Sequence, residues 1–185
     1  CQIGIGGQNC HQIENYGSFT GSVSASMLKK AGAEYIILGH SENRSEGESN
    51  KFIIGDLPFL SYRQNQTIAM QSIMALIQAG AHAVKLEGCQ GNLELIRYCV
   101  DSGVPVMGHL GLTPQSIHAM GGYKVQGKSD MAAHRIMNEA RLLEKAGCFA
   151  VVLECVPEGL ARDITNELAI PTIGIGAGVD TSGQV

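Results

Sequence analysis

The sequence has no block of basic residues, no long apolar run and no leader-like start. Its 13 lysine and arginine residues are scattered along 185 positions and its net charge is −4, so nucleic acid is not expected as a partner. The apolar runs, such as residues 149–153, are far shorter than the ~20 residues of a membrane span. We therefore expect a cytoplasmic protein that binds neither nucleic acid nor a membrane.

Closely spaced cysteines are also absent, although the chain has six cysteines. None of them forms a CxxC motif or a close Cys/His pair of the kind that binds zinc. Free thiols are therefore expected instead of a disulfide framework. Because 185 residues with 44% hydrophobic content can bury one core, we expect a single domain over residues 1–185.

One unit recurs along the sequence. A helical stretch is followed by a glycine that can end a helix and then by a short apolar run that favours a strand, and this occurs at Gly32, Gly80, Gly103 and Gly147. Alternating helices and strands predict a parallel sheet that is buried on both faces. A βα barrel is the natural closure of such a sheet, so the fold class predicted is α/β.

The number of strands is one short of a full barrel. Strands are predicted near residues 2–6, 35–38, 52–55, 82–86, 104–108, 149–153 and 171–175. Helices are predicted over residues 22–30, 67–78, 91–101, 131–145 and 158–167. A complete barrel has eight strands, so we expect an incomplete barrel of about seven strands with its eighth strand missing.

Ionisable side chains lie where four of the predicted strands end. These are Asp56 after the third strand, Lys85 and Glu87 on the fourth, His109 after the fifth and Glu154 after the sixth. In a βα barrel the carboxyl ends of the strands converge on one face. Charged groups at such buried positions need partners or a metal ion. The sequence therefore predicts one common polar site.

The chemistry of these residues suits a 2-oxo acid substrate. Asp56 and Glu87 could share Mg²⁺, which prefers oxygen ligands and leaves positions open for a substrate. A metal ion stabilises negative charge on the substrate as an enolate forms. Glu154 is then the candidate base, Lys85 would hold the substrate carboxylate, and His109 would donate or accept a hydrogen bond within the site.

Long motifs run through the chain after Asn50. They are GDLPFLSY at 55–62, VKLEG at 84–88, GHLGLTPQS at 108–116, GGYKVQG at 121–127 and VLECVP at 152–157. In these motifs residues 51–185 resemble the ketopantoate hydroxymethyltransferase family. The resemblance implies a TIM-type (β/α)8 barrel, a Mg²⁺ cofactor and 5,10-methylenetetrahydrofolate as co-substrate. The activity implied is hydroxymethyl transfer to 3-methyl-2-oxobutanoate, which gives ketopantoate in pantothenate biosynthesis.

The same resemblance implies a role for each matched residue. Asp56 and Glu87 match metal ligands, and Glu154 matches the proton acceptor. Ser41 and Lys85 match substrate contacts, and Asp56 also lies at the substrate. His109 is placed with the catalytic residues as a hydrogen-bonding group of the site.

His40 departs from that family. The family has Gly-Asp-Ser at the end of its second strand, and this chain has Gly39-His40-Ser41. The family's aspartate is a metal ligand and a substrate neighbour. A neutral imidazole supplies neither its charge nor the hard oxygen that Mg²⁺ prefers, so weaker metal binding is expected.

Residues 1–50 instead resemble the triosephosphate isomerase family, through GQNC at 7–10, GSFTG at 17–21 and LGHSE at 38–42. His40 matches the electrophilic histidine of that family, but the lysine and the late phosphate loops of the isomerase are absent. We therefore interpret the chain as a hybrid of two barrel families. Both families form homo-oligomers, so a homo-oligomer is expected. A recombined or fragmentary barrel without turnover is the alternative to the transferase, and isomerase activity is a remote one.

Overall fold

The computed structural model describes the backbone of residues 4–8 and 33–37 and all of residues 52–185. Within these ranges the chain forms a single parallel sheet. Its strands are β1 (Gly4–Gln8), β2 (Ala33–Ile37), β3 (Ile54–Asp56), β4 (Ala83–Glu87), β5 (Val106–Gly111), β6 (Ala150–Glu154), β7 (Thr172–Ile175) and β8 (Gly183–Gln184). The order across the sheet is β2-β1-β8-β7-β6-β5-β4-β3, and neighbouring strands run parallel. The predicted parallel α/β architecture is therefore confirmed.

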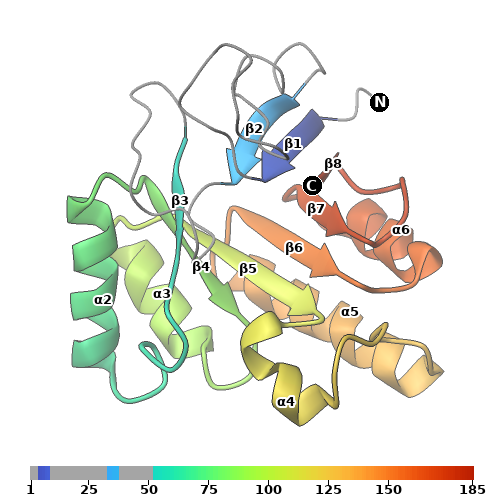
Figure 1. Ribbon diagram of the computed structural model, residues 1–185, viewed down its shortest axis with the longest axis horizontal. Helices are drawn as coiled ribbons and strands as arrows, with labels where there is room; N and C mark the ends of the chain where they lie inside the picture. Colours follow the sequence, from blue (N-terminus) through green and yellow to red (C-terminus); the bar gives the residue numbers. More distant parts are fainter. Residues whose placement is uncertain (1–3, 9–32, 38–51) are drawn as a thin grey trace, which may run out of the picture.

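The expectation of a missing eighth strand was wrong. A strand lies close to each of the seven predicted places, and the additional strand β8 pairs with both β7 and β1. It is only two residues long, so it leaves no apolar run for a sequence pattern to detect. The contiguous strands β3 to β8 form a curled half-barrel, and β1 and β2 extend it at one edge (Figure 1).

The four longer described helices are close to those expected from the sequence. The described helices are α2 (Gln66–Gln78), α3 (Leu93–Asp101), the 3-10 helix η1 (Pro114–Ser116), α4 (Ile117–Met120), α5 (Asp130–Lys145) and α6 (Glu158–Glu167). The short helices η1 and α4 were not expected, and the helix predicted over residues 22–30 lies outside the described residues. The side chains of Asn65 and Ser129 cap α2 and α5, each accepting a hydrogen bond from a main-chain N–H of the first turn. None of the helices described is long and apolar enough to cross a membrane.

Strand alternation divides the core into two parts. Side chains such as Val84, Leu86 and Leu153 point outward and pack with helix residues in the larger buried cluster. The intervening side chains, Ala83 and Val152 among them, face the concave side of the sheet with Met107 in a smaller cluster. Because successive strand residues point to opposite faces, any side chain in step with Ala83 or Val152 also faces the inside of the curl.

Candidate active site

The predicted strand-end residues are in step with the inner cluster. Lys85 and Glu87 follow Ala83 at two-residue intervals on β4, and Glu154 follows Val152 on β6. Asp56 is paired in register with Lys85, and His109 with Glu87. The same alternation that buries the apolar core therefore brings these five side chains together at the carboxyl ends of four adjacent strands.

Lys85 lies at the centre of the group and is only 8% exposed. Its Nζ is 2.9 Å from Asp56 Oδ2, 3.9 Å from Glu87 Oε1 and 3.3 Å from His109 Nδ1. The ammonium thus offsets two carboxylates that would otherwise repel each other across neighbouring strands. A buried cation among carboxylates also provides a place where the carboxylate of a small acid could bind.

His109 connects Lys85 to Glu154. Its side chain is 2% exposed, and burial lowers its pKa even though the Glu154 carboxylate favours the charged ring. The Lys85 ammonium can only donate, so the facing Nδ1 of a neutral His109 accepts and Nε2 carries the proton. Nε2 lies 3.1 Å from Glu154 Oε2, without the alignment of a hydrogen bond. Such contacts in a ligand-free site often become aligned when substrate binds.

The carboxyl group of Glu87 is buried and its pKa is shifted. Burial raises its pKa to about 7, against the opposing effects of Lys85 and of a hydrogen bond from the main-chain N–H of Gln115. That N–H donates to Glu87 Oε2 over 2.9 Å. Perturbed carboxyl groups in a polar cluster are typical of functional sites.

Asp56 and Glu87 fit the role of a pair of metal ligands. They lie on adjacent strands, and Asp56 Oδ1 is buried without a hydrogen-bond partner in the described part of the chain. An orphaned carboxylate oxygen of this kind suits coordination of a cation. No cluster of three or more histidine, cysteine or acidic residues suited to a metal occurs among the described residues. The remaining ligands would then be water or substrate oxygens.

Two predicted residues, His40 and Ser41, lie outside the residues that the structure describes. Two contacts of the site, Gln115 and Tyr62, were not predicted from the sequence. Tyr62 Oη donates to Gln115 Oε1 over 2.9 Å. Both lie inside the motifs at 55–62 and 108–116, but a search for ionisable strand-end groups passes over an amide and a phenol.

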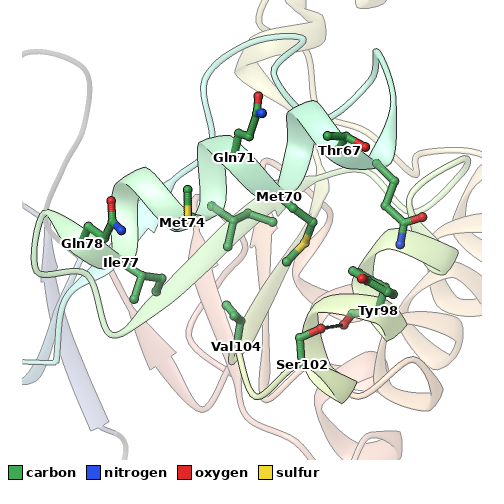
Figure 2. A pocket seen from close by; sticks show the side chains of 11 residues that line it. Thr67, Met70, Gln71, Met74, Ile77, Gln78, Tyr98, Ser102 and Val104 are labelled. Carbon is green, nitrogen blue, oxygen red and sulfur yellow. Dashed lines mark hydrogen bonds between the residues drawn. The ribbon is translucent and has the colours of Figure 1, made fainter.

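A groove of about 620 Å³ lies elsewhere, on the outer side of the sheet between α2 and the segment around α3. Figure 2 shows that its lining includes Met70, Met74, Ile77, Tyr98 and Val104. None of the strand-end residues lines it. The candidate active site is therefore assigned from the convergence of Asp56, Lys85, Glu87, His109 and Glu154, and the groove is a separate feature.

Solved structures with a similar fold are distant in sequence. A phosphoenolpyruvate phosphomutase from Streptomyces platensis subsp. rosaceus is 11% identical with a TM-score of 0.62, and covers 100% of this chain and 76% of its own. A 2,3-dimethylmalate lyase of the PEP mutase/isocitrate lyase superfamily is 12% identical with a TM-score of 0.55, over 92% and 66%. With the strand order, these likenesses support the predicted TIM-barrel-like fold and say nothing of the reaction.

Curated relatives are much closer in sequence. An enzyme of Francisella tularensis subsp. tularensis named 3-methyl-2-oxobutanoate hydroxymethyltransferase is 60% identical over 141 residues, which are 76% of this chain and 53% of the relative. Enzymes of the same name from Bdellovibrio bacteriovorus and Coxiella burnetii are 57% and 58% identical over 81% of this chain and 57% of their own lengths. The chain thus spans about half the length of the curated relatives that it matches.

Two family profiles match the sequence. The triosephosphate isomerase profile matches residues 1–69, which is less than half of the chain. The ketopantoate hydroxymethyltransferase profile matches residues 36–185 and includes every strand-end residue of the described site. The two matches overlap over residues 36–69, so they do not by themselves locate a junction. The chain belongs to the ketopantoate hydroxymethyltransferase family.

Proposed function

We propose that this chain catalyses transfer of a hydroxymethyl group from 5,10-methylenetetrahydrofolate to 3-methyl-2-oxobutanoate, which gives ketopantoate. The observation that carries the proposal is the buried cluster of Asp56, Lys85, Glu87, His109 and Glu154 at adjacent strand ends. Family membership and the names of the relatives support the reaction. We also propose, from length and composition, a single barrel domain over residues 1–185 in a cytoplasmic protein, and a homo-oligomer because both resembled families form one.

In this proposal Asp56 and Glu87 hold Mg²⁺, supported by the orphaned Asp56 Oδ1. Bound Mg²⁺ would supply Lewis-acid stabilisation of the negative charge that develops on the keto oxygen of the substrate. Lys85 would neutralise the substrate carboxylate, because its ammonium already lies between the carboxylates of the site. Ser41 is proposed as a further substrate contact on the basis of the motif alone.

Glu154 is proposed to take the C3 proton of 3-methyl-2-oxobutanoate. The C3–H bond breaks, the proton moves to the Glu154 carboxylate, and the electron pair forms the enolate. His109 Nε2, 3.1 Å from Glu154 Oε2, would keep that carboxylate facing the substrate. Water hydrolyses the methylene group of the folate, both of its carbon–nitrogen bonds break, and the protons of the water go to the two nitrogens. The enolate C3 then bonds to the released one-carbon unit, whose oxygen takes the proton held by Glu154 and becomes the hydroxyl group of the product.

The test is formation of ketopantoate from both substrates and Mg²⁺, followed by mass spectrometry. Glu154→Gln should lower the rate at least about 100-fold, since it removes a general base. Glu158→Gln is the matched control, because Glu158 is exposed at the start of α6. Product from the unsubstituted chain with equal rates for both variants would exclude Glu154 as the base, and no product would contradict the transferase proposal.

A barrel without turnover is the second candidate. One observation favours it: the triosephosphate isomerase profile matches residues 1–69. His40 separates the transferase from the inactive barrel, because it stands where the transferase family has an aspartate metal ligand. Isomerase activity remains a remote proposal, because the lysine and the phosphate loops of that enzyme have no counterparts in the sequence.

A further inference from the structure

Gln115 connects three segments around the candidate site. It lies in η1, directly after β5. Its main-chain N–H donates to Glu87 Oε2 over 2.9 Å, and its side-chain Nε2 donates to the carbonyl oxygen of Leu57 over 2.8 Å. Its Oε1 accepts from Tyr62 Oη over 2.9 Å. One residue therefore joins the ends of β3 and β4 to the segment that follows β5.

The orientation of the Gln115 amide is fixed by these partners. The Leu57 carbonyl can only accept a hydrogen bond, so the nitrogen of the amide faces Leu57 and the oxygen faces Tyr62. Tyr62 is 7% exposed, and burial together with the Glu87 charge raises its pKa to about 12. The phenol therefore remains protonated at neutral pH, and turning the amide over would set Gln115 Oε1 against the Leu57 carbonyl oxygen and lose that hydrogen bond.

The two oxygens of Glu87 have different surroundings. Oε2 accepts the Gln115 N–H, whereas Oε1 faces Lys85 Nζ at 3.9 Å and His109 Nδ1 at 3.8 Å, both beyond hydrogen-bond distance. The main chain of Glu87 is held as well, because Asn92 Nδ2 donates to its carbonyl oxygen over 3.0 Å. Of the two Glu87 oxygens, only Oε1 is left without a hydrogen bond from the described residues, and it faces the centre of the site.

We propose that Gln115 is a positioning residue, whose side chain holds its own N–H on Glu87 Oε2 so that Oε1 is available to the metal ion. This rests on the proposed function, in which Glu87 is a metal ligand. Groups that orient metal ligands typically change metal affinity by about 10- to 100-fold when they are removed. Gln115 acts through Glu87 and needs no contact with the substrate.

The experiment measures the Kd of Mn²⁺, as a probe for Mg²⁺, by electron paramagnetic resonance on the whole chain. Gln115→Ala should weaken Mn²⁺ binding about tenfold or more, and Tyr62→Phe should weaken it by a smaller factor because it removes one of the two side-chain anchors. Gln90→Ala is the matched control, since Gln90 is exposed and its side chain contacts Glu139 over 3.4 Å instead of the strand-end residues. Melting temperatures of all variants are recorded alongside.

Two results would overturn the proposal. The first is that the Kd of Mn²⁺ is unchanged in Gln115→Ala and Tyr62→Phe, although Glu87→Gln weakens binding. Gln115 would then have a structural role only, even if the melting temperatures of its variants fall. The other is no Mn²⁺ binding by the unsubstituted chain. Weakened binding in Gln115→Ala in a chain that makes no ketopantoate would support the positioning role and contradict the proposed function, so the two failures are distinguishable.

Discussion

Among the single residues of the site, Glu87 has a pKa that makes the stability of the fold depend on pH. Its pKa of about 7 lies above the ordinary value of 4.5, so the folded protein holds this proton more tightly than the unfolded chain does. The stabilisation from the proton is complete below about pH 4.5 and is lost as the pH rises through about 7. At neutral pH the folded state therefore bears a partly charged, buried carboxyl group.

Glu87→Gln should remove this pH dependence. Relative to the variant, the free energy of unfolding of the unsubstituted protein should fall by up to about 3 kcal/mol between pH 4.5 and pH 8. Urea unfolding of both proteins across that range, without divalent metal, measures the difference. Because both proteins contain His109, its titration affects both stability profiles in nearly the same way. Parallel stability profiles would show that the pKa of Glu87 is not raised.

The tautomer of His109 leads to a second prediction at this scale. The amide nitrogen of glutamine can replace Nε2, whereas the shorter asparagine reaches only the position of Nδ1. We expect proton abstraction from the substrate to be about tenfold faster in His109→Gln than in His109→Asn, because the former keeps a donor near Glu154. Deuterium incorporation rates compare the two variants. Equal rates would mean that His109 does not act through Glu154.

At the scale of elements, the turn after β5 fixes the end of β6. Gly111 has φ +87°, and a Cβ at this position would overlap the main-chain carbonyl oxygen of Glu154 and approach Val156 Cγ1 at 2.7 Å. That carbonyl also accepts a hydrogen bond from Leu112 N over 2.7 Å. The close contact of these two strand ends is what places Glu154 beside His109.

Gly111→Ala should therefore destabilise the fold and displace Glu154. Gly103 is the matched control, because it has a similar φ of +84° but a Cβ added there would have no atom within 4 Å. We expect Gly103→Ala to cost about 1 kcal/mol from backbone conformation alone and Gly111→Ala to cost at least about 2 kcal/mol more. Urea unfolding compares them, and equal losses would contradict the proposed contact.

The helices and strands also show which parts of the fold sequence patterns can predict. Apolar runs and helix-ending glycines predicted β3 to β7 and the longer helices of residues 52–185, because local burial and a positive φ at Gly80, Gly103 and Gly147 are properties of short segments. The short helices η1 and α4 were not predicted. The convergence of strand carboxyl ends in a βα barrel likewise predicted that one face would hold Asp56, Lys85, Glu87, His109 and Glu154. Strand β8 was not predictable in this way, since two residues paired between β1 and β7 carry no pattern of their own.

Gln115 shows the other limit of sequence reasoning. Its role depends on a main-chain N–H and on partners at the end of β4 and in the segment that follows β3. Neither the type of residue nor its spacing encodes those contacts, which follow from tertiary packing. The places of His40 and Ser41 stay predictions because these positions lie outside the described residues. The interpretation of residues 1–50 as part of a hybrid also stays a prediction, since the two family profiles overlap over residues 36–69.

At the scale of the whole molecule, the question is whether the first part of the chain completes the site. His40→Asp restores the Gly-Asp-Ser pattern of the family and would add a carboxylate ligand. We expect the Kd for Mn²⁺ to fall about tenfold, measured by the same titration, with His118→Asp as a control outside the site. An unchanged Kd would show that position 40 does not face the metal.

The proposed function requires the strand ends of β3 to β6 to form a working enolate site. This requirement can be measured as the loss of the C3 proton signal of 3-methyl-2-oxobutanoate in D₂O, followed by nuclear magnetic resonance with Mg²⁺ and without folate. We expect Mg²⁺-dependent exchange by the unsubstituted chain and at least about 100-fold slower exchange by Glu154→Gln. Exchange by the unsubstituted chain that is no faster than in that variant would contradict the proposed site.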